Sequence, residues 1–323
     1  MPTNDQILKA AGITTDDVTY GLLSPEQSKR FIQQTFEATP LGPLVRHEMR
    51  RAKTGEIDKI GIASRIVRKK VENIDAQADG SAPVLDPTTG QITGYRAKPT
   101  FAQVPYATKA VRLPWEITEE TLRENIEGEG LEATITNLMT RQLGVDMEDL
   151  YLNADTATAN TDPDYLFLYI NDGWIKQVEN GGHVYSATGL PSMSLDMFYN
   201  AMGALPNKYN NGRLRWLMSP HRKQQWELFL LNQGLNSGAN FPDSLYENPA
   251  SIPAVQVPRM PDSKIMLVDP QNLIVVNTYD VKIRKTTEGK DAIMADKRFY
   301  VVHLDYDSII EELDATAIIT NIS

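Results

Sequence analysis

The sequence predicts an α+β protein, and three features of the chain carry that prediction. An apolar stripe between Leu131 and Leu152 follows the period of an amphipathic helix. Two extended runs, Glu56–Lys70 and Thr100–Trp115, alternate apolar and polar side chains as strands do. The C-terminal part adds five strand-like runs: Ile265–Val268, Leu273–Val276, Val281–Lys285, Phe299–Leu304 and Thr316–Ile319. The 323 residues suffice for one large or two modest domains.

The composition is that of a globular protein without membrane or secretion signals. Hydrophobic residues make up 41% and charged residues 23% of the chain, which is ordinary for a soluble domain. No apolar run reaches the roughly 18–20 residues that span a bilayer. The start, Met1–Asp5, lacks the basic and then apolar pattern of a secretory signal. Zero cysteines exclude disulfides and thiolate metal sites and fit a reducing cytoplasm.

The charge is acidic overall but uneven along the chain. The net charge is −10, which argues against binding nucleic acid through bulk electrostatics alone. Residues 45–72 nevertheless hold nine Lys or Arg against four Asp or Glu, a local net charge of +5. Two interpretations stay open. The segment is either an ordinary solvated basic face or a basic arm that docks on an acidic neighbouring copy, because opposite charges steer association.

The N-terminal segment is predicted to be an arm, because its helices hold few apolar residues and cannot bury much alone. A short helix is expected over residues 3–11. A second helix starts at Ser24, where Pro25 takes the first helical position and Gln27 completes a capping box. Pro40 ends this helix.

The connection between the two extended runs, Asn73–Lys98, is polar and rich in Gly and Pro. Its length of roughly 25 residues exceeds an ordinary hairpin turn, and loops of that length tend to be functional or mobile. The two runs and this tip predict a long β-hairpin that projects from the body of the protein. An isolated hairpin is only marginally stable in water, so a neighbouring copy is expected to supply the surface on which it lies.

The longest predicted helix covers residues 131–152. Its apolar stripe consists of Leu131, Ile135, Leu138, Met139, Leu143, Met147 and Leu150. Leu138 lies in the middle of the stripe and is expected in the core. Gly144 is expected to mark close packing or a slight bend, because glycine costs about 1 kcal/mol against alanine inside a helix. Thr118 is expected to cap a short acidic helix before it.

Mixed helix and strand signals follow this helix. A helix is expected around Leu195–Leu205, and a buried strand at Arg215–Pro220. Ser219-Pro220 then opens an amphipathic helix that is expected to end near Gly234.

No motif supports catalysis, a cofactor or a metal. Gly128–Ala133 matches the letters of a dinucleotide-binding turn, yet no apolar strand precedes it and it carries two glutamates. The four histidines are scattered without metal-ligand spacing: His47, His183, His221 and His303. An acidic run near the C-terminus is expected to be a solvated or contact face rather than a calcium site: Asp305, Asp307, Glu311, Glu312 and Asp314. The chain is therefore predicted to be no enzyme, with no catalytic, cofactor-binding or metal-ligating residue.

Five segments occur in an informative order: Lys109–Leu122, Leu131–Leu152, Asn171–Gln177, Ala204–Pro220 and Pro253–Pro270. Together they resemble the major capsid proteins of tailed bacteriophages, which have the Hong Kong 97-type fold. The resemblance covers nearly the whole chain, from about Ser24 to Ile322. In it, the first segment corresponds to the strand that returns from an extended loop, and the second to the long spine helix. The third and fourth correspond to the axial domain, and the fifth to the return into the peripheral domain.

The resemblance implies an α+β chain of the Hong Kong 97 type with four parts. These are an N-terminal arm (residues 1–54), an extended β-hairpin loop (55–115), a peripheral domain with the spine helix (116–158 and 255–308) and an axial α/β domain (159–254 and 309–323). It also implies a structural function, in which hexamers and pentamers tile an icosahedral shell that encloses packaged double-stranded DNA. The implied location is the virion capsid, after assembly in the host bacterial cytoplasm.

The partners implied by the resemblance are other copies of the chain, a portal protein, and DNA bound without sequence specificity, but no membrane. A separate scaffolding protein is expected as well, because the first residues leave no room for a cleaved scaffold domain. No cofactor is implied. The residues expected to contact neighbouring subunits are Arg46, Arg50, Arg51, Arg65, Arg68, Lys69, Lys70 and Phe101.

Two alternatives stay open. An encapsulin-type bacterial nanocompartment shares this fold but stores an enzyme cargo instead of DNA, and co-purifying cargo would favour it. A soluble α/β hydrolase or similar enzyme would be a free monomer with a polar pocket. The long loop tip and the basic arm favour the viral interpretation.

Overall fold

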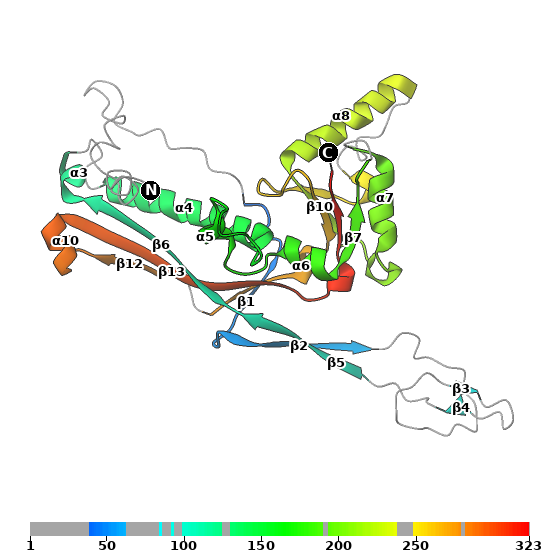
Figure 1. Cartoon of the computed structure of the whole chain (residues 1–323), viewed down its shortest axis with the longest axis horizontal. Helices are drawn as coiled ribbons and strands as arrows, with labels where there is room; N and C mark the ends of the chain where they lie inside the picture. Colours follow the sequence, from blue (N-terminus) through cyan, green and yellow to red (C-terminus); the bar gives the residue numbers. More distant parts are fainter. Residues whose placement is uncertain are drawn as a thin grey trace. The chain divides into compact units, whose positions relative to one another are not determined.

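The computed structural model describes residues 39–62, 84–85, 92–93, 99–124, 130–189, 193–237, 248–278 and 282–322. Figure 1 shows its helices and strands along the chain. The chain divides into two compact units, one formed by Thr54–Ala107 and the other by the rest of the chain. The predicted helices at residues 3–11 and from Ser24 lie outside the described residues, as do residues 128 and 129 of the Gly128–Ala133 pattern.

The smaller unit is a β-hairpin. Strand β2 (Thr54–Ile62) pairs antiparallel with β5 (Pro99–Ala107), from Thr54 opposite Ala107 to Ile62 opposite Pro99. Two further short strands, β3 (Val84–Leu85) and β4 (Ile92–Thr93), pair with each other. The predicted pairing of the two extended runs is confirmed over Thr54–Ile62 and Pro99–Ala107, while residues 63–70 and most of the tip Asn73–Lys98 lie outside the described residues. The second predicted strand is not one run to Trp115. The pairing partner changes at Thr108, and β6 (Lys109–Thr118) belongs to the larger unit.

The larger unit holds two five-stranded sheets. The first, here called the long sheet, has the order β1-β11-β13-β12, with β6 pairing along the other side of β13. Its strands are β1 (Arg46–Met49), β6, β11 (Leu273–Asn277), β12 (Lys282–Thr286) and the 14-residue β13 (Lys297–Ile310). The long β13 lies at the centre of this sheet. Strand β6 pairs with one edge of β13 over Lys297–Tyr306, and β12 and β11 pair with the other edge.

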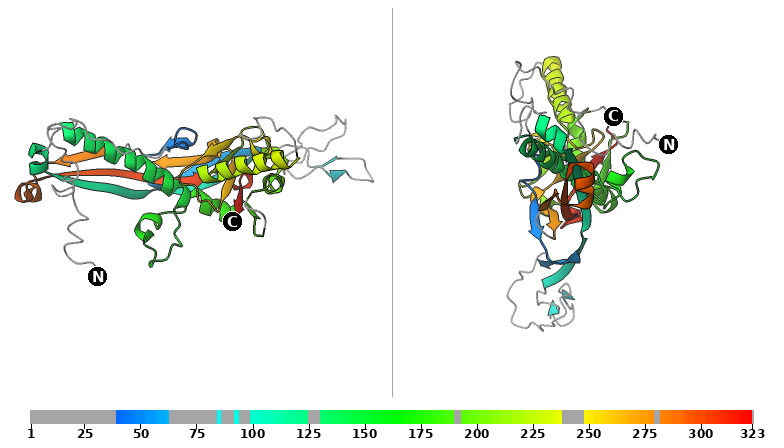
Figure 2. Two further views of the ribbon diagram at one scale, coloured as in Figure 1. Left: turned by 90° about the horizontal axis from the view of Figure 1, so that it is seen from above. Right: turned by 90° about the vertical axis from the view of Figure 1, so that its left-hand side faces the viewer.

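Two helices follow β6. Helix α3 (Glu119–Glu124) is capped by Thr118, whose Oγ1 accepts the Thr121 backbone N–H at 3.2 Å, as predicted. Helix α4 (Gly130–Asn153) runs along the long sheet (Figures 1 and 2) and matches the predicted spine helix within two residues. Its buried side chains Leu131, Ile135, Met147 and Leu150 form one cluster with side chains of β6 and β13.

One expectation about α4 is wrong, and one of the two alternatives for Gly144 is excluded. Leu138 is only half-buried and lies outside the core cluster, whereas Met139, one position on, packs against it. Gly144 does not mark close packing, because it is exposed and a Cβ there would meet no atom within 4 Å.

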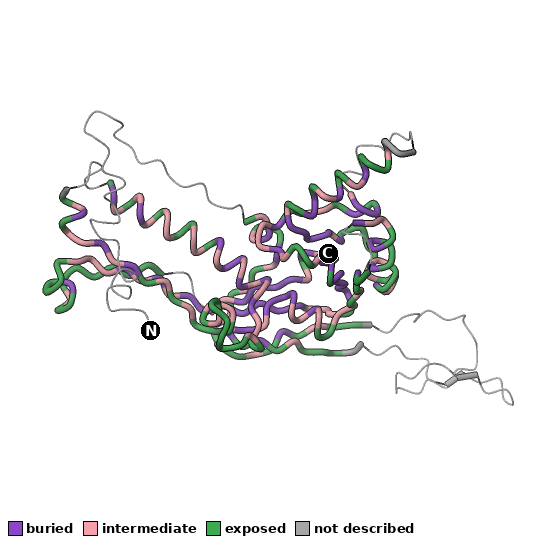
Figure 3. The backbone as a smooth tube through the Cα atoms, turned by 45° about the horizontal axis from the view of Figure 1, so that its top comes forward, coloured by how far each residue is buried: buried purple, intermediate pink, exposed green. Residues whose placement is uncertain are grey.

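The second sheet, here called the buried sheet, has the order β7-β14-β10-β8-β9. Its strands are β7 (His183–Ser186), β8 (Arg215–Met218), β9 (Ala254–Gln256), β10 (Ile265–Val268) and β14 (Ala317–Thr320). Helix α6 (Trp174–Gly181) packs on one face, and α7 (Leu195–Ala204) and α8 (Pro220–Ser237) pack on the other. Both faces are covered, so every residue of β10 and β14 is buried. Figure 3 colours the buried residues of the chain purple.

The remaining helices are short. They are α5 (Tyr165–Leu168), α10 (Lys290–Ala295), and the 3-10 turns η2 (Asn207–Tyr209), η3 (Pro249–Ser251), η4 (Pro270–Asn272) and η5 (Leu313–Ala315). The helices predicted at Leu195–Leu205 and from Pro220, and the five predicted C-terminal strands, are all present, although α8 continues past Gly234 to Ser237. Within the described residues, no helix is long and apolar enough to cross a membrane.

Candidate assembly surfaces

One face of the β2–β5 hairpin is packed. Ile57, opposite Val104, and Tyr106, opposite Gly55, are both buried to 7% exposure. Gly55 leaves room for this ring, because a Cβ at this position would lie 2.7 Å from the Tyr106 Oη and the ring would have to shift. Strand side chains alternate between the two faces, so the residues between these positions belong to the opposite face.

That opposite face carries exposed apolar side chains. Ile60 and Phe101 stand directly opposite each other across the two strands and are 69% and 73% exposed. Nearer the base, Asp58 accepts a hydrogen bond from the Gln103 side chain at 3.0 Å, and Glu56 is exposed. This surface, Glu56, Asp58, Ile60 and Phe101, is called the outer face of the hairpin below. Phe101 was predicted as a contact residue from the sequence; its partner Ile60 was not, because the strand register sets that pairing.

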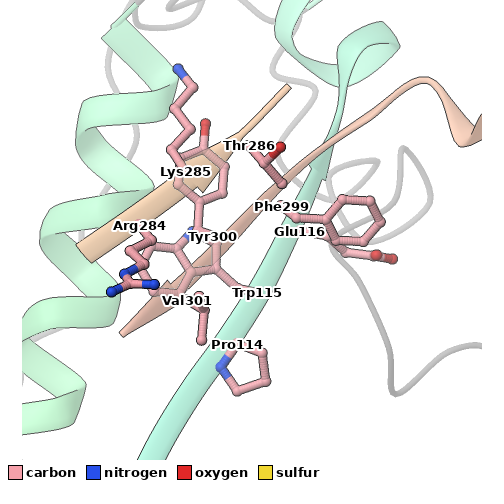
Figure 4. A pocket seen from close by; sticks show the side chains of 9 residues that line it. All are labelled: Pro114, Trp115, Glu116, Arg284, Lys285, Thr286, Phe299, Tyr300 and Val301. Carbon is pink, nitrogen blue, oxygen red and sulfur yellow. The ribbon is translucent and has the colours of Figure 1, made fainter. Parts of the chain in front are cut away.

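A second exposed surface lies on the long sheet, on the face away from α4. Trp115 and Tyr300 stack at 5.3 Å and are buried beneath α4 with Leu131. Their neighbours along the strands therefore point the other way. These form two cross-strand rows, Pro114–Val301–Arg284 and Glu116–Phe299–Thr286. Strands β6, β12 and β13 form a hollow of roughly 720 Å³, lined by these two rows and by Trp115, Tyr300 and Lys285 of the row between them (Figure 4). This surface is called the open face below.

The next row on the open face places three basic side chains side by side. Arg112, His303 and Lys282 are directly opposite one another on β6, β13 and β12, and Arg284 follows in the adjacent row. Arg112, Lys282 and Arg284 are exposed, and none of them forms an ion pair with a described residue. Arg112 and Lys282 give this row a positive charge, so a negatively charged occupant would be attracted to it.

The predicted basic contact residues divide into three groups. Arg46 forms ion pairs with Glu311 at 2.7 Å and Glu48 at 3.2 Å, and Arg50 pairs with Glu48 at 2.5 Å. Arg51 is exposed and forms no ion pair with any described residue. Four further residues, Arg65, Arg68, Lys69 and Lys70, lie outside the described residues. Arg46 and Arg50 thus already have acidic partners within the chain.

The acidic run near the C-terminus is not a solvated face throughout. Asp305 is fully buried and pairs with Lys53 at 2.9 Å, and its carboxylate accepts the Thr278 hydroxyl at 3.0 Å. Asp307 is buried and accepts a hydrogen bond from the Asn171 side chain at 3.3 Å. The expectation of a solvated or contact face is therefore wrong for Asp305 and Asp307. These carboxylates fasten Lys53 and Asn171 to β13.

A further residue that the sequence did not single out is Glu148 on α4. Its side chain is buried and accepts the backbone N–H of Leu41 at 3.1 Å. The signal was present in the spacing, since Glu148 falls three residues after the buried Val145 and four before the buried Leu152. Acidic residues are seldom buried, so this spacing alone does not single out Glu148.

One polar cluster resembles a catalytic constellation in its residue types only. Ser219 Oγ and His221 Nδ1 both contact the Asp262 carboxylate, the histidine at 3.1 Å. The serine also accepts the Arg222 backbone N–H at 3.2 Å, which is the geometry of a helix cap. Because both side chains share the aspartate, the serine has no histidine base within this cluster. The arrangement caps α8.

Comparisons with known proteins agree with this architecture. No family profile matches the chain. The chain is 24% identical over 99% of its own length and 99% of the other's to the "Putative prophage capsid protein YqbE" of Bacillus subtilis strain 168. Its structure is similar to a chain of the satellite phage P4 procapsid, with TM-score 0.57, 14% identity and coverage of 88% of this chain and 95% of that chain.

Two other solved structures share the architecture. The capsid of an empty GTA particle has TM-score 0.60 and 10% identity, covering 96% of this chain and 98% of that chain. The chain has the phage capsid fold. The predicted resemblance and fold class are confirmed. The SrpI encapsulin of Synechococcus elongatus PCC 7942 also matches, with TM-score 0.58, 11% identity and coverage of 97% of this chain and 96% of that chain. The fold alone therefore does not separate a phage capsid from an encapsulin.

Proposed function

We propose that this chain is a structural capsid protein that assembles as hexamers and pentamers into an icosahedral shell around packaged double-stranded DNA. The similarity to a prophage capsid protein over 99% of both chains carries this proposal. Under it, the location is the virion capsid after assembly in the host bacterial cytoplasm. The partners are other copies, a portal protein, a separate scaffolding protein and DNA bound without sequence specificity. The role is structural, with no enzymatic activity.

The four parts expected from the sequence belong to this proposal. Residues 1–54 would be the arm and 55–115 the extended loop. The peripheral domain would comprise 116–158 and 255–308, and the axial domain 159–254 and 309–323. Two observations bear on these limits: the compact hairpin unit ends at Ala107, and β6 pairs with β13 in the larger unit.

The proposed contact between copies joins the two exposed surfaces. The outer face of the hairpin combines acids, Glu56 and Asp58, with the apolar pair Ile60 and Phe101. The open face of the long sheet combines the basic residues Arg112, Lys282 and Arg284 with the apolar Pro114, Phe299 and Val301. The two surfaces carry opposite charges, and both carry apolar side chains. The hairpin of one copy would therefore lie on the open face of a second. Arg51 and the basic residues of 65–70 would add contacts with acidic neighbours.

The experiment that tests this contact is a charge reversal with rescue. Glu56→Lys with Asp58→Lys should block assembly while leaving the melting of the free subunit nearly unchanged, because both side chains are exposed. Adding Arg112→Glu and Lys282→Glu should restore particles, measured by sedimentation velocity and negative-stain microscopy. Leu166→Asp, which changes an 88% exposed apolar residue outside both surfaces, is the matched control and should assemble. Particles from the first variant alone would contradict the contact.

A second candidate is an encapsulin-type shell, favoured by the similarity to SrpI at TM-score 0.58. Shells purified from the native source would then hold one protein cargo and no nuclease-protected DNA. Protected double-stranded DNA without stoichiometric cargo would support the phage capsid instead.

A further inference from the structure

Glu148 is a buried acid without a basic partner in the part of the chain that the structure describes. Its side chain is 4% exposed, and no described Lys, Arg or His forms an ion pair with it. The carboxylate instead accepts the Leu41 backbone N–H at 3.1 Å. A buried carboxylate that no cation neutralises destabilises the structure unless it takes up a proton. The hydrogen bond to the Glu148 carboxylate comes from Leu41, which belongs to the chain segment that covers it.

That segment is residues 39–49, and it is fastened from several directions. Leu41 and Val45 are buried in the core shared with Trp174 and Leu273. The Leu44 carbonyl accepts a hydrogen bond from the Gln271 side chain at 2.6 Å. Residues 46–49 pair in parallel with β11. The segment therefore docks as a unit onto α4, α6 and β11, with Glu148 beneath its first turn.

A second titratable side chain grips the same turn from the other side. The His47 Nε2 lies 2.8 Å from the Gly42 carbonyl oxygen and donates to it. Leu41 and Gly42 are thus held between a carboxylate that accepts and an imidazole that donates. A hollow of roughly 380 Å³ adjoins them, lined by Thr39, Thr140, Leu143 and Asn277 among others.

The other groups around Glu148 do not neutralise it. Tyr151, one turn along α4, has its pKa raised mainly by burial and further by the Glu148 charge. Trp174 from α6, Asn277 from β11 and Leu304 from β13 complete the lining and are uncharged. The nearby Arg46 is paired with Glu48 and Glu311. Burial accordingly raises the pKa of Glu148 to about 7 from 4.5, although the backbone N–H groups of Leu41 and Gly42 oppose the shift.

We propose that residues 39–49 form a proton-dependent clasp, which closes over Glu148 with uptake of one proton and loosens when that carboxyl ionises. The direction of the pH dependence follows from the pKa of Glu148 in the released and the docked state. In the released state Glu148 is solvated and ionises near its ordinary value; in the docked state it holds its proton to about pH 7. Docking is therefore strongest below about pH 4.5 and weakens as the pH rises to about 7. The docking constant changes by at most ten raised to the power of the pKa difference between the docked and released states, which is roughly 300-fold.

Amide hydrogen exchange of the full chain, kept unassembled, tests the clasp. Wild type and Glu148→Gln are compared at the same pH, so that the intrinsic pH dependence of exchange cancels. At pH 5 peptides covering residues 41–49 should exchange at rates within about fourfold of each other in the two proteins. At pH 8 the wild type should exchange faster in these peptides, by tenfold to roughly 300-fold. Peptides covering β10 should exchange at the same rate in wild type and Glu148→Gln at both pH values. Asp146→Asn, which removes a half-buried carboxylate that accepts a hydrogen bond from Gln142 on the same helix, should behave as wild type.

Two results would overturn the clasp. One is a ratio between wild type and Glu148→Gln in residues 41–49 that is the same at pH 5 and pH 8. The other is an equal change in β10, which would place the effect in global unfolding. If Glu148→Gln does not fold, the wild type alone decides, because its residues 41–49 must lose protection relative to β10 between pH 5 and pH 8.

Discussion

Strand β10 of the buried sheet and strand β2 of the hairpin both carry isoleucines, yet these side chains meet different surroundings. Ile265 on β10 is fully buried, whereas Ile60 on β2 is 69% exposed. β10 has a strand on each edge and helices on both faces, whereas β2 pairs with β5 alone. The buried sheet therefore stabilises the subunit itself. The outer face of the hairpin stabilises little within the subunit, so its apolar side chains remain free for a contact between copies.

The largest expected effect compares two phenylalanines. Phe198 packs edge-on against Trp216 at 4.9 Å and Trp226 at 5.0 Å in the core of the buried sheet. Phe198→Ala should lower the free energy of unfolding by about 3–5 kcal/mol. Phe101→Ala should lower it by less than about 1 kcal/mol, the size of one cross-strand pair. Denaturant unfolding of unassembled subunits measures both.

The assembly of the same two variants sharpens the comparison. Phe101→Ala should reduce particle formation although its subunit is stable. Equal losses of unfolding free energy in the two variants would mean that the hairpin is as tightly packed as the core of the free subunit, and the comparison would fail.

A second pair of variants tests the register of α4. Leu150 is 3% exposed and belongs to the cluster beneath the helix, whereas Leu138 is half-buried and lies outside it. Leu150→Ala should cost about 2–5 kcal/mol through a cavity, and Leu138→Ala under about 1 kcal/mol. Thermal melts of both proteins measure the difference. A larger loss of stability in Leu138→Ala than in Leu150→Ala would support the buried position of Leu138 predicted from the sequence.

The existence of α4 could be predicted because its apolar period extends over the whole helix, but its exact buried face could not. Leu138 and Met139 are adjacent, and both fit a stripe that is about 100° wide. Met139, and not Leu138, packs against the cluster between α4 and the long sheet. The break between β5 and β6 was also hidden, because Phe101, Val111, Leu113 and Trp115 keep one parity across it. The change of pairing partner at Thr108 leaves no trace in that alternation.

The candidate surfaces were predicted only in part. Phe101 could be identified because it is a large apolar residue in a hairpin without a core of its own. Ile60 and the row Arg112–His303–Lys282 could not, because they meet through strand register between segments far apart in sequence. The same holds for Asp305, whose burial depends on Lys53. Local patterns reveal periodicity, whereas these pairings are set by the tertiary fold.

A third pair of variants compares a paired arginine with an unpaired one. Arg298 binds Glu119 through two contacts, at 2.5 and 3.0 Å, and Glu132 at 2.6 Å. Arg298→Gln should cost about 1–2 kcal/mol, between an exposed ion pair and a buried charged hydrogen bond. Arg112→Gln, on the open face, should leave subunit stability within about 0.5 kcal/mol but weaken assembly. Chemical denaturation and sedimentation together separate the two outcomes.

The cost of Arg298→Gln should depend on pH. The hydrogen bond from Arg298 lowers the pKa of Glu119 below its ordinary value. A carboxyl with a lowered pKa contributes stability above its unfolded pKa and loses it as the pH falls through the lowered value. The difference in unfolding free energy between wild type and Arg298→Gln should therefore shrink on acidification below about pH 4.5. A difference that stays constant down to pH 3 would show that Glu119 gains nothing from Arg298.

The smallest expected effect concerns Gly144, an exposed residue of α4 next to the hollow beside residues 39–49. Alanine there meets no atom within 4 Å and replaces the most flexible residue inside a helix. Gly144→Ala should therefore stabilise the free subunit by about 0.5–1 kcal/mol. Its particles should form as in wild type if this face of α4 stays open, like the solvent side of an ordinary helix. A more stable subunit that fails to assemble would show that a second copy approaches at Gly144, and the interface would then extend from the hairpin and the open face to α4.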